Sequence, residues 1–287
     1  MKRLFALLTL ALILVGCASE PISRDKTIRL SGELADTAEA VYFLAGEAAY
    51  GTREIFAMDK DSLAIESTGK SGRVLFADDE ELYICGDTFA TLSGETASYA
   101  GMNRFLISPT GLLFYPRYES ETYILNRNDG SDVRSSEYFP LFDPAAEEYT
   151  RVWAEELGDG AFAYEAEHGG KRHRLAELSV QLFDAMEYFQ LYRGIVYVSA
   201  EDGITAVKLK NGARTDIFAD GTLMAAAHER LFIRQGEDLV ITTLSGAELG
   251  RLEAVYADGA YVYADSCEPV VYVIDPAAMT AEAYRIL

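Results

Sequence analysis

A short aromatic pattern recurs along the 287-residue chain, and it constrains the fold more than any other feature. Each copy is an aromatic residue between apolar neighbours, usually preceded by a turn former. Seven copies occur, at residues 41–43, 82–84, 113–115, 161–163, 196–198, 231–233 and 260–262. Their aromatic residues are about 37 residues apart on average, a period typical of repeat architectures.

Further short apolar runs lie on both sides of each copy and indicate strands. They are rich in β-branched and aromatic residues and are bounded by turn formers such as Asn211-Gly212 and Asp258-Gly259. Four antiparallel strands in about 37 residues is the size of one β-propeller blade. Because a single blade cannot bury both its faces, a ring of blades is needed. The sequence therefore predicts an all-β protein, a β-propeller of seven four-stranded blades, with six or eight left open.

Two local features modify this picture. Residues 28–30 and 284–287 are both strand-like, so their pairing within one blade would close the ring as a clasp. Asp143 followed by Pro144 is typical of a helix start, which predicts a short helical turn at 144–149 and then a strand.

The repeat also assigns strand positions. Tyr83, Tyr197 and Phe232 should occupy equivalent positions and pack between neighbouring blades. Residues 152–154 are expected as the inner strand of the fourth copy, and residues 254–256 as the inner strand of the seventh.

The first residues of the chain are typical of an export signal. Lys2 and Arg3 are followed by an apolar stretch at 4–15, which is too short to span a bilayer core of about 30 Å. The stretch ends in Leu-Val-Gly-Cys, with the cysteine at position 17, and this tetrapeptide resembles the lipobox of bacterial lipoproteins. The alternative is an ordinary secretory signal with a chance cysteine.

The lipoprotein resemblance implies a lipid anchor on Cys17. In that family a diacylglyceryl group joins the cysteine thiol, cleavage follows just before the cysteine, and the new amine often carries a further acyl chain such as palmitate. The expected domains are a removed signal at 1–16, the lipidated cysteine and a polar tether at 17–26, and the propeller at 27–287. The expected place is extracytoplasmic, at the outer face of the cytoplasmic membrane, or at the outer membrane of a two-membrane host.

The repeat itself resembles quinoprotein-like or WD-like β-propellers in architecture. No Gly-His and Trp-Asp signature is present, and the single Trp153 cannot supply a tryptophan motif to every blade. The resemblance therefore implies a fold and no particular activity.

The charge balance excludes one class of partner. There are 46 acidic and 25 basic residues, and the net charge of −21 leaves no basic footprint for a nucleic acid. Three cysteines in so long a chain also exclude a fold built on disulfides.

The side chains most often used in catalysis are better explained by turns. His168 and His173 flank a Gly-Gly hairpin, and His228 lies in a turn, so all three are expected to be solvated. Cys85 and Cys267 have no basic neighbour that would lower the pKa of the thiol, and both are expected to be inert.

Two stretches with alternating oxygen ligands, 59–61 and 126–132, are similar to calcium loops but lack the full twelve-residue pattern. They are expected to be tight turns. The sequence predicts no catalytic residue, no metal ligand and no cofactor.

Acidic residues gather in the loops expected between the second and third strands of five successive blades, on one face of the disc. This acidic rim comprises Glu119, Glu121, Glu167, Glu201, Asp202, Glu237, Asp238, Asp265 and Glu268. It could attract a basic protein, a peptide or a divalent cation. The alternative is that a strongly acidic protein places acids in its loops for solubility.

Two functions from different classes fit these observations. The favoured one is a non-enzymatic binding or assembly scaffold for a protein or polymer partner at the bacterial envelope. The alternative is a propeller-type enzyme, a metal-dependent lactonase or a glycosidase, with its site in the central channel. The expected inner strands are mostly apolar, as at Val74, Phe76 and Leu106, which favours the scaffold.

Overall fold

The structure is a computed structural model, and it describes fifteen stretches of the chain. They are residues 33–49, 51–77, 82–85, 89–92, 96–97, 102–107, 111–116, 122–126, 132–135, 138–143, 145–146, 148–181, 184–200, 203–265 and 268–286. Strands dominate them, and no helix in these stretches is long and apolar enough to cross a membrane. The predicted all-β class is confirmed.

The described strands form seven antiparallel sheets, numbered here in chain order. Sheets 1 to 3 contain β1 (Leu34–Asp36), β2 (Ala40–Ala49), β3 (Thr52–Asp59) and β4 (Ile65–Gly72); β5 (Val74–Ala77), β6 (Leu82–Cys85), β7 (Phe89–Thr91) and β8 (Thr96–Ala97); and β9 (Met102–Ile107), β10 (Gly111–Pro116), β11 (Thr122–Asn126) and β12 (Asp132–Ser135).

Sheets 4 to 7 continue the series. They contain β13 (Tyr138–Asp143), β14 (Glu148–Gly158), β15 (Ala161–His168) and β16 (Lys171–Leu178); β17 (Phe189–Tyr192), β18 (Ile195–Ala200), β19 (Gly203–Lys208) and β20 (Arg214–Phe218); β21 (Thr222–Ala227), β22 (Arg230–Gln235), β23 (Asp238–Thr243) and β24 (Glu248–Leu252); and β25 (Tyr261–Ala264), β26 (Val270–Asp275) and β27 (Thr280–Arg285). Two short 3-10 helices, η2 (Asp184–Tyr188) and η3 (Ala257–Gly259), precede sheets 5 and 7.

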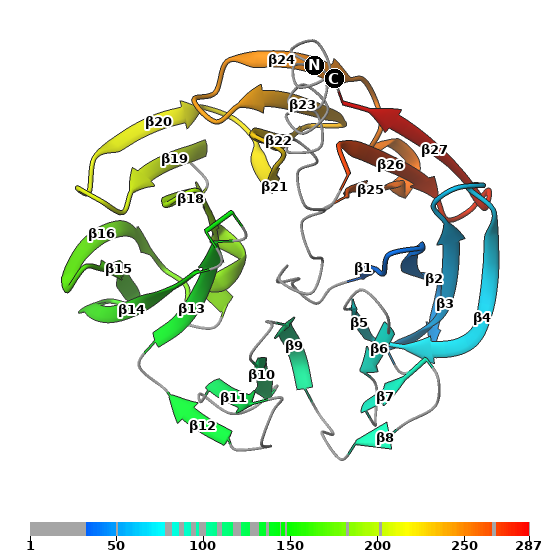
Figure 1. Cartoon of the computed structure of the whole chain (residues 1–287), viewed down its shortest axis with the longest axis horizontal. Coiled ribbons are helices and arrows are strands. Elements are labelled where there is room, and N and C mark those ends of the chain that lie inside the picture. Colours follow the sequence, from blue (N-terminus) through cyan, green and yellow to red (C-terminus); the bar gives the residue numbers. More distant parts are fainter. Residues whose placement is uncertain are drawn as a thin grey trace, which may run out of the picture.

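Figure 1 shows the sheets arranged around a common centre, with the first strand of each sheet innermost. Each sheet is a meander in which strands pair in chain order, and the first strands of several neighbouring sheets contact one another. The connection between a first and a second strand, here called the inner turn, therefore lies on one face of the molecule. Connections between second and third strands lie on the opposite face.

The hydrophobic core lies between sheets and not within them. Tyr197 of sheet 5 packs with Leu231 and Ile233 of sheet 6, while Phe232 packs with Val271 of sheet 7. Alternation along β22 thus sends successive side chains to opposite neighbours, because side chains on a strand alternate between its two faces. Where the side chains are described, from sheet 4 through sheet 7 to sheets 1 and 2, each sheet covers the next, as the repeat predicts for blades.

Two of the predicted inner strands were assigned to the wrong segment, one too late in the chain and one too early. Trp153 lies in β14, the second strand of sheet 4, and the inner strand is β13. Tyr261 lies in β25, the first strand of sheet 7, and residues 254–256 come before it outside any strand. The aromatic pattern marks a strand but carries no information on that strand's order within its sheet.

The predicted helical turn at 144–149 is also wrong in extent. Asp143 pairs with Glu148 across β13 and β14, so the connection is short. The Asp143 side chain accepts a hydrogen bond from the Ala145 amide at 3.0 Å. Such a bond occurs in turns as well as at helix starts. Pairing of the two strands leaves no room for a helix.

The three aromatic residues predicted to be equivalent differ in burial. Tyr197 and Phe232 are fully buried, but Tyr83 is only half-buried. Leu82 and Ile84, on either side of Tyr83, pack with sheet 1, so Tyr83 faces away from the preceding sheet, as Tyr197 and Phe232 do.

The predicted clasp remains a prediction. Within the described part of the chain, sheet 7 has three strands and β27 pairs with β26 alone. Residues 28–30 and Leu287 lie outside the described residues.

We expect Gly203→Ala to destabilise the fold by at least about 2 kcal/mol. Gly203 has a φ of +108°, and a Cβ there would lie 2.1 Å from the Phe218 carbonyl oxygen. Gly160→Ala is the matched control, since its φ is +77° and nothing lies within 4 Å of its Cβ, so only backbone strain of about 1 kcal/mol is expected. Urea unfolding measures both, and equal losses would contradict the close approach at Gly203.

Candidate functional site

Three buried carboxylates stand out in the described part of the chain. Asp36 ends β1, Asp143 ends β13 and Asp265 directly follows β25, so each lies where a first strand meets its inner turn. Their exposed fractions are 0%, 2% and 1%. A buried carboxylate is costly unless it is paired or hydrogen-bonded, so the partners of these three define the polar interior of the molecule.

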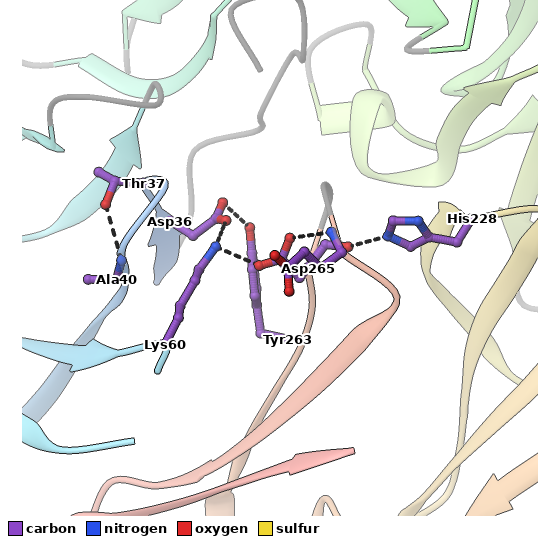
Figure 2. A network of polar contacts seen from close by, with 8 residues as sticks. Asp36, Thr37, Ala40, Lys60, His228, Tyr263 and Asp265 are labelled. Atoms are coloured by element: carbon purple, nitrogen blue, oxygen red, sulfur yellow. Dashed lines mark hydrogen bonds and ion pairs between the residues drawn. The ribbon is translucent and has the colours of Figure 1, made fainter. Parts of the chain in front are cut away.

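Asp36 and Asp265 share one lysine. The Lys60 ammonium, in the turn after β3, lies 2.6 Å from Asp36 Oδ2 and 2.5 Å from Asp265 Oδ2. The Tyr263 hydroxyl donates to the other Asp36 oxygen at 2.5 Å, and the Glu268 amide donates to the other Asp265 oxygen at 3.0 Å. Figure 2 shows this cluster between the first strand of sheet 1 and the first strand of sheet 7.

The cluster has more negative than positive charge. Its two carboxylates face one ammonium whose side chain is 8% exposed. The negative charge of the cluster also acts on Tyr272 in β26. Burial is the main cause that raises the pKa of this phenol to about 12, and the charges of Asp265 and Glu268 raise it further. Tyr272 therefore stays neutral over the physiological range, and it adds no further charge beside the two carboxylates.

His228 connects this cluster to sheet 6. Its Nε2 lies 2.8 Å from the Asp265 carbonyl oxygen, and because a carbonyl only accepts, Nε2 carries the proton. The residue lies in the β21–β22 inner turn, where His228 and Glu229 both have positive φ. The prediction that His228 is solvated is wrong, since the side chain is half-buried. Figure 2 shows its contact with Asp265.

The same arrangement continues towards sheet 4. Asp143 accepts hydrogen bonds from the Arg193 amide at 2.9 Å and the Gly194 amide at 2.5 Å, in the inner turn of sheet 5. The Arg193 side chain forms an ion pair with Glu229, and the Glu229 amide donates to the Tyr192 hydroxyl at 3.2 Å. We call this series of contacts, which joins sheets 4, 5, 6, 7 and 1 through their inner turns and the Lys60 turn, the polar chain.

A second polar cluster lies at the opposite end of the contact between sheets 7 and 1. The Tyr261 hydroxyl donates to the Leu44 carbonyl at 2.7 Å and also contacts Arg53 and Glu33. Arg53 and Glu33 form an ion pair. Tyr261 and Tyr263 are two residues apart in β25 and therefore share one face, so both hydroxyls reach sheet 1.

A hollow of about 630 Å³ lies beside the inner turn of sheet 1, lined by residues that include Thr37, Tyr42 and Glu66. Asp59 also lines it, but its Oδ1 accepts bonds from the Ser62 amide and hydroxyl, both at 2.7 Å. These bonds hold the pKa of the Asp59 carboxyl below its usual value. The stretch 59–61 is thus a turn, as predicted. In the part of the chain described, no group of three or more His, Cys, Asp or Glu is placed to hold a metal ion.

The predicted acidic rim is not gathered on one face by its described members. Glu237 and Asp238 lie at the β22–β23 connection, as expected. Glu167 lies beside the β15–β16 hairpin, and Asp265 and Glu268 follow β25, so these three belong to the opposite face. The error follows from the strand offset in the fourth and seventh copies, and Asp265 is moreover buried.

Other predicted site residues lie outside the described stretches. They are Cys17, Glu119, Glu121, Glu201, Asp202 and Cys267. Cys85 ends β6, and His168 is exposed at its hairpin, as expected.

Sequence reasoning missed Lys60 and Asp36, and it placed Asp143 and Asp265 in other roles. One signal was present: Ala precedes Asp at the end of the first strand in Ala35-Asp36 and Ala264-Asp265. The partner of both carboxylates is Lys60, which is 205 residues from Asp265, and no local pattern connects the two.

Comparisons with known proteins show the fold alone. No family model matches the chain, and a search of curated proteins returns no match. A solved structure of PorZ, an essential bacterial surface component of the type-IX secretion system of Porphyromonas gingivalis, has a TM-score of 0.53 at 11% identity. The similarity covers 91% of this chain but only 39% of the PorZ chain.

A chain of the Mitotic Checkpoint Complex is similar to the same extent. Its TM-score is 0.55 at 8% identity, over 91% of this chain and 95% of that chain. At such identities the likeness supports an all-β, propeller-like fold and does not extend to activity.

Proposed function

We propose that this protein is a lipid-anchored, extracytoplasmic β-propeller of seven blades that acts as a non-enzymatic binding scaffold at a bacterial cell envelope. The observation that carries the proposal is the combination of an export signal ending in Leu-Val-Gly-Cys17 with a propeller-like domain. Two or three acyl chains would hold the domain at a membrane, where one chain gives only marginal binding. PorZ provides a precedent for this fold in a bacterial surface component.

The polar chain supports a scaffold function. Asp36, Asp143 and Asp265 are all engaged by groups of the protein itself, so they serve to join the sheets. The net charge of −21 favours a partner with a basic surface, because like charges repel across an interface. Exposed acids such as Glu237 occur at connections between second and third strands, where a partner could reach them.

The enzyme alternative would draw on Asp36 and Asp265, because a glycosidase needs two carboxylates near one another. Both contact the same ammonium, which occupies the space between them. A substrate would have to displace Lys60, and this favours the structural role. If the protein turned over a lactone or a glycoside and the Asp36→Asn variant did not, the enzyme alternative would be supported.

The anchor is tested with Cys17→Ser in the native host. We expect the variant to lose its lipid label and to leave the membrane pellet, or to remain as an uncleaved precursor. Cys85→Ser is the matched control, because it removes a thiol that has no role in the proposal and should leave the labelling unchanged. A mature-sized Cys17→Ser protein that stayed in the pellet would refute the lipid anchor.

The partner class is tested by crosslinking the lipidated protein in its own membrane. A photo-reactive group at the exposed Glu237 position samples one face, and a group at exposed Asp61 samples the other. We expect adducts at one face only, which added salt should weaken. Adducts in equal yield from both faces, insensitive to salt, would contradict a specific basic partner.

A further inference from the structure

The hollow beside the inner turn of sheet 1 owes its shape to small side chains. Tyr42, Ala57 and Glu66 are neighbours across β2, β3 and β4, and Ala40 and Asp59 form the next row. Residues two apart on a strand share a face, so both rows lie on the same face of sheet 1. The short alanine side chains there leave a space of about 630 Å³, a volume within the usual range for a ligand pocket.

The walls of the hollow are held in place by backbone contacts. In the inner turn, the Thr37 amide donates to the Ala40 carbonyl at 2.9 Å, and the Ala40 amide donates to the Thr37 hydroxyl at 3.3 Å (Figure 2). The Lys60 amide donates to the Glu39 carbonyl at 2.9 Å, which joins this turn to the turn between β3 and β4. A ligand would therefore lose little free energy to the ordering of the site.

Three carboxylates give the hollow a negative rim. Glu39 lies in the inner turn, Asp59 ends β3 and Glu66 lies in β4, and all three residues are exposed. Glu39 and Glu66 form no ion pair in the described part of the chain. Lys60 follows Asp59 but does not offset this charge, because its ammonium lies between two buried carboxylates.

We propose that this hollow receives a lysine or arginine side chain of the partner protein. Such a side chain combines an apolar stem with a cationic head, and the hollow offers alanine methyl groups and the Tyr42 ring beside carboxylates. The inference rests on the proposed function and names the contact through which a basic partner binds. A single metal ion fits less well, because its oxygen ligands converge to about 2.3–2.6 Å.

The first test measures binding of a model side chain to the lipidated full chain in detergent. The probe is N-acetyl-arginine methylamide, and the methyl signals of Ala40, Ala57 and Ala64 are followed by nuclear magnetic resonance. We expect these signals to shift on titration. The citrulline analogue has nearly the same shape but no charge, and it should cause a much smaller shift.

Charge variants identify the carboxylates that bind the probe. Glu39→Gln combined with Glu66→Gln should weaken binding about tenfold, because two charge pairs are lost. Glu237→Gln combined with Glu253→Gln is the matched control. It changes the net charge equally at exposed positions on the opposite face, and it should leave the affinity unchanged.

A shape variant separates the hollow from its charge. Ala57→Leu keeps the net charge and fills the floor, so binding of the probe should fall about tenfold or more. Ala64→Leu, at an exposed position of the same floor, provides the same test if Ala57→Leu does not fold. Binding that survives the leucine variants, or that is equal for the citrulline analogue, would overturn the proposal.

The second test uses the native membrane and the photo-reactive group at Asp61, one residue before Ser62 of the hollow. We expect its adducts to decrease in Glu39→Gln with Glu66→Gln and to persist in the control pair. Adducts confined to the Glu237 position would overturn this inference and leave the scaffold function in place. If neither position gave adducts, the scaffold function would be refuted, and with it the partner side chain, even where the probe binds.

Discussion

Phe232→Ala is expected to lower the free energy of unfolding by about 3–5 kcal/mol, the usual cost of truncating a buried aromatic residue. Phe232 is 1% exposed and packs among Leu239, Ile241 and Val271, between sheets 6 and 7. The variant loses the free energy of transferring the ring out of water. It also leaves a cavity between sheets 6 and 7, and these sheets cannot close over it freely because each also packs against a further sheet. Urea unfolding followed by circular dichroism measures the effect.

Two controls separate packing from other effects. Met224→Ala, at a side chain that is 41% exposed in β21 of the same sheet, should cost less than about 0.5 kcal/mol. Tyr197→Phe keeps a buried ring and loses only a 3.3 Å bond to the Leu244 carbonyl, so about 1 kcal/mol is expected. A loss below about 1 kcal/mol for Phe232→Ala would mean that β22 is one residue out of register.

Asp143→Ala should be the second most damaging of these changes, at about 3 kcal/mol. The carboxylate is 2% exposed and accepts from three amides, those of Ala145, Arg193 and Gly194. Its removal leaves these three amides without their acceptor and a cavity where the buried carboxylate stood, and the contact between sheets 4 and 5 loses its polar link. Thermal and urea unfolding of the pure protein measure the loss.

Asp238→Ala provides a matched control for this carboxylate. Asp238 also accepts from an amide, that of Ala254 at 2.9 Å, and from Arg251, but its side chain is 29% exposed. Both bonds hold its pKa below the usual value, yet water can replace them when the carboxylate is removed. We expect a loss below about 1 kcal/mol, and a larger loss than that of Asp143→Ala would contradict the burial argument.

The strands could be predicted because they repeat. Composition and alternation are local properties, so runs such as 196–198 and 231–233 were placed in strands correctly. The order of strands within sheets 4 and 7 could not be predicted this way. Trp153 in a second strand and Tyr261 in a first strand look alike in sequence, since both are aromatic residues beside apolar neighbours.

The candidate site was largely beyond sequence reasoning for a different reason. Its contacts join residues that the chain brings together only when sheet 7 meets sheet 1, as in the pairing of Asp36 with Tyr263, 227 positions apart. Nor did any local signal indicate the His228-Glu229 turn, where both residues adopt positive φ without a glycine. A hydrogen bond from His228 to the next sheet accompanies that backbone conformation.

The polar chain also has a practical consequence for engineering. It involves the inner turns, so a fluorescent reporter or an epitope tag spliced in at Arg193-Gly194 would separate Asp143 from its donors. The β14–β15 hairpin at Asp159-Gly160 lies on the opposite face, is exposed, and has open space around its glycine. Foreign sequence inserted there should leave the packing of the sheets unchanged.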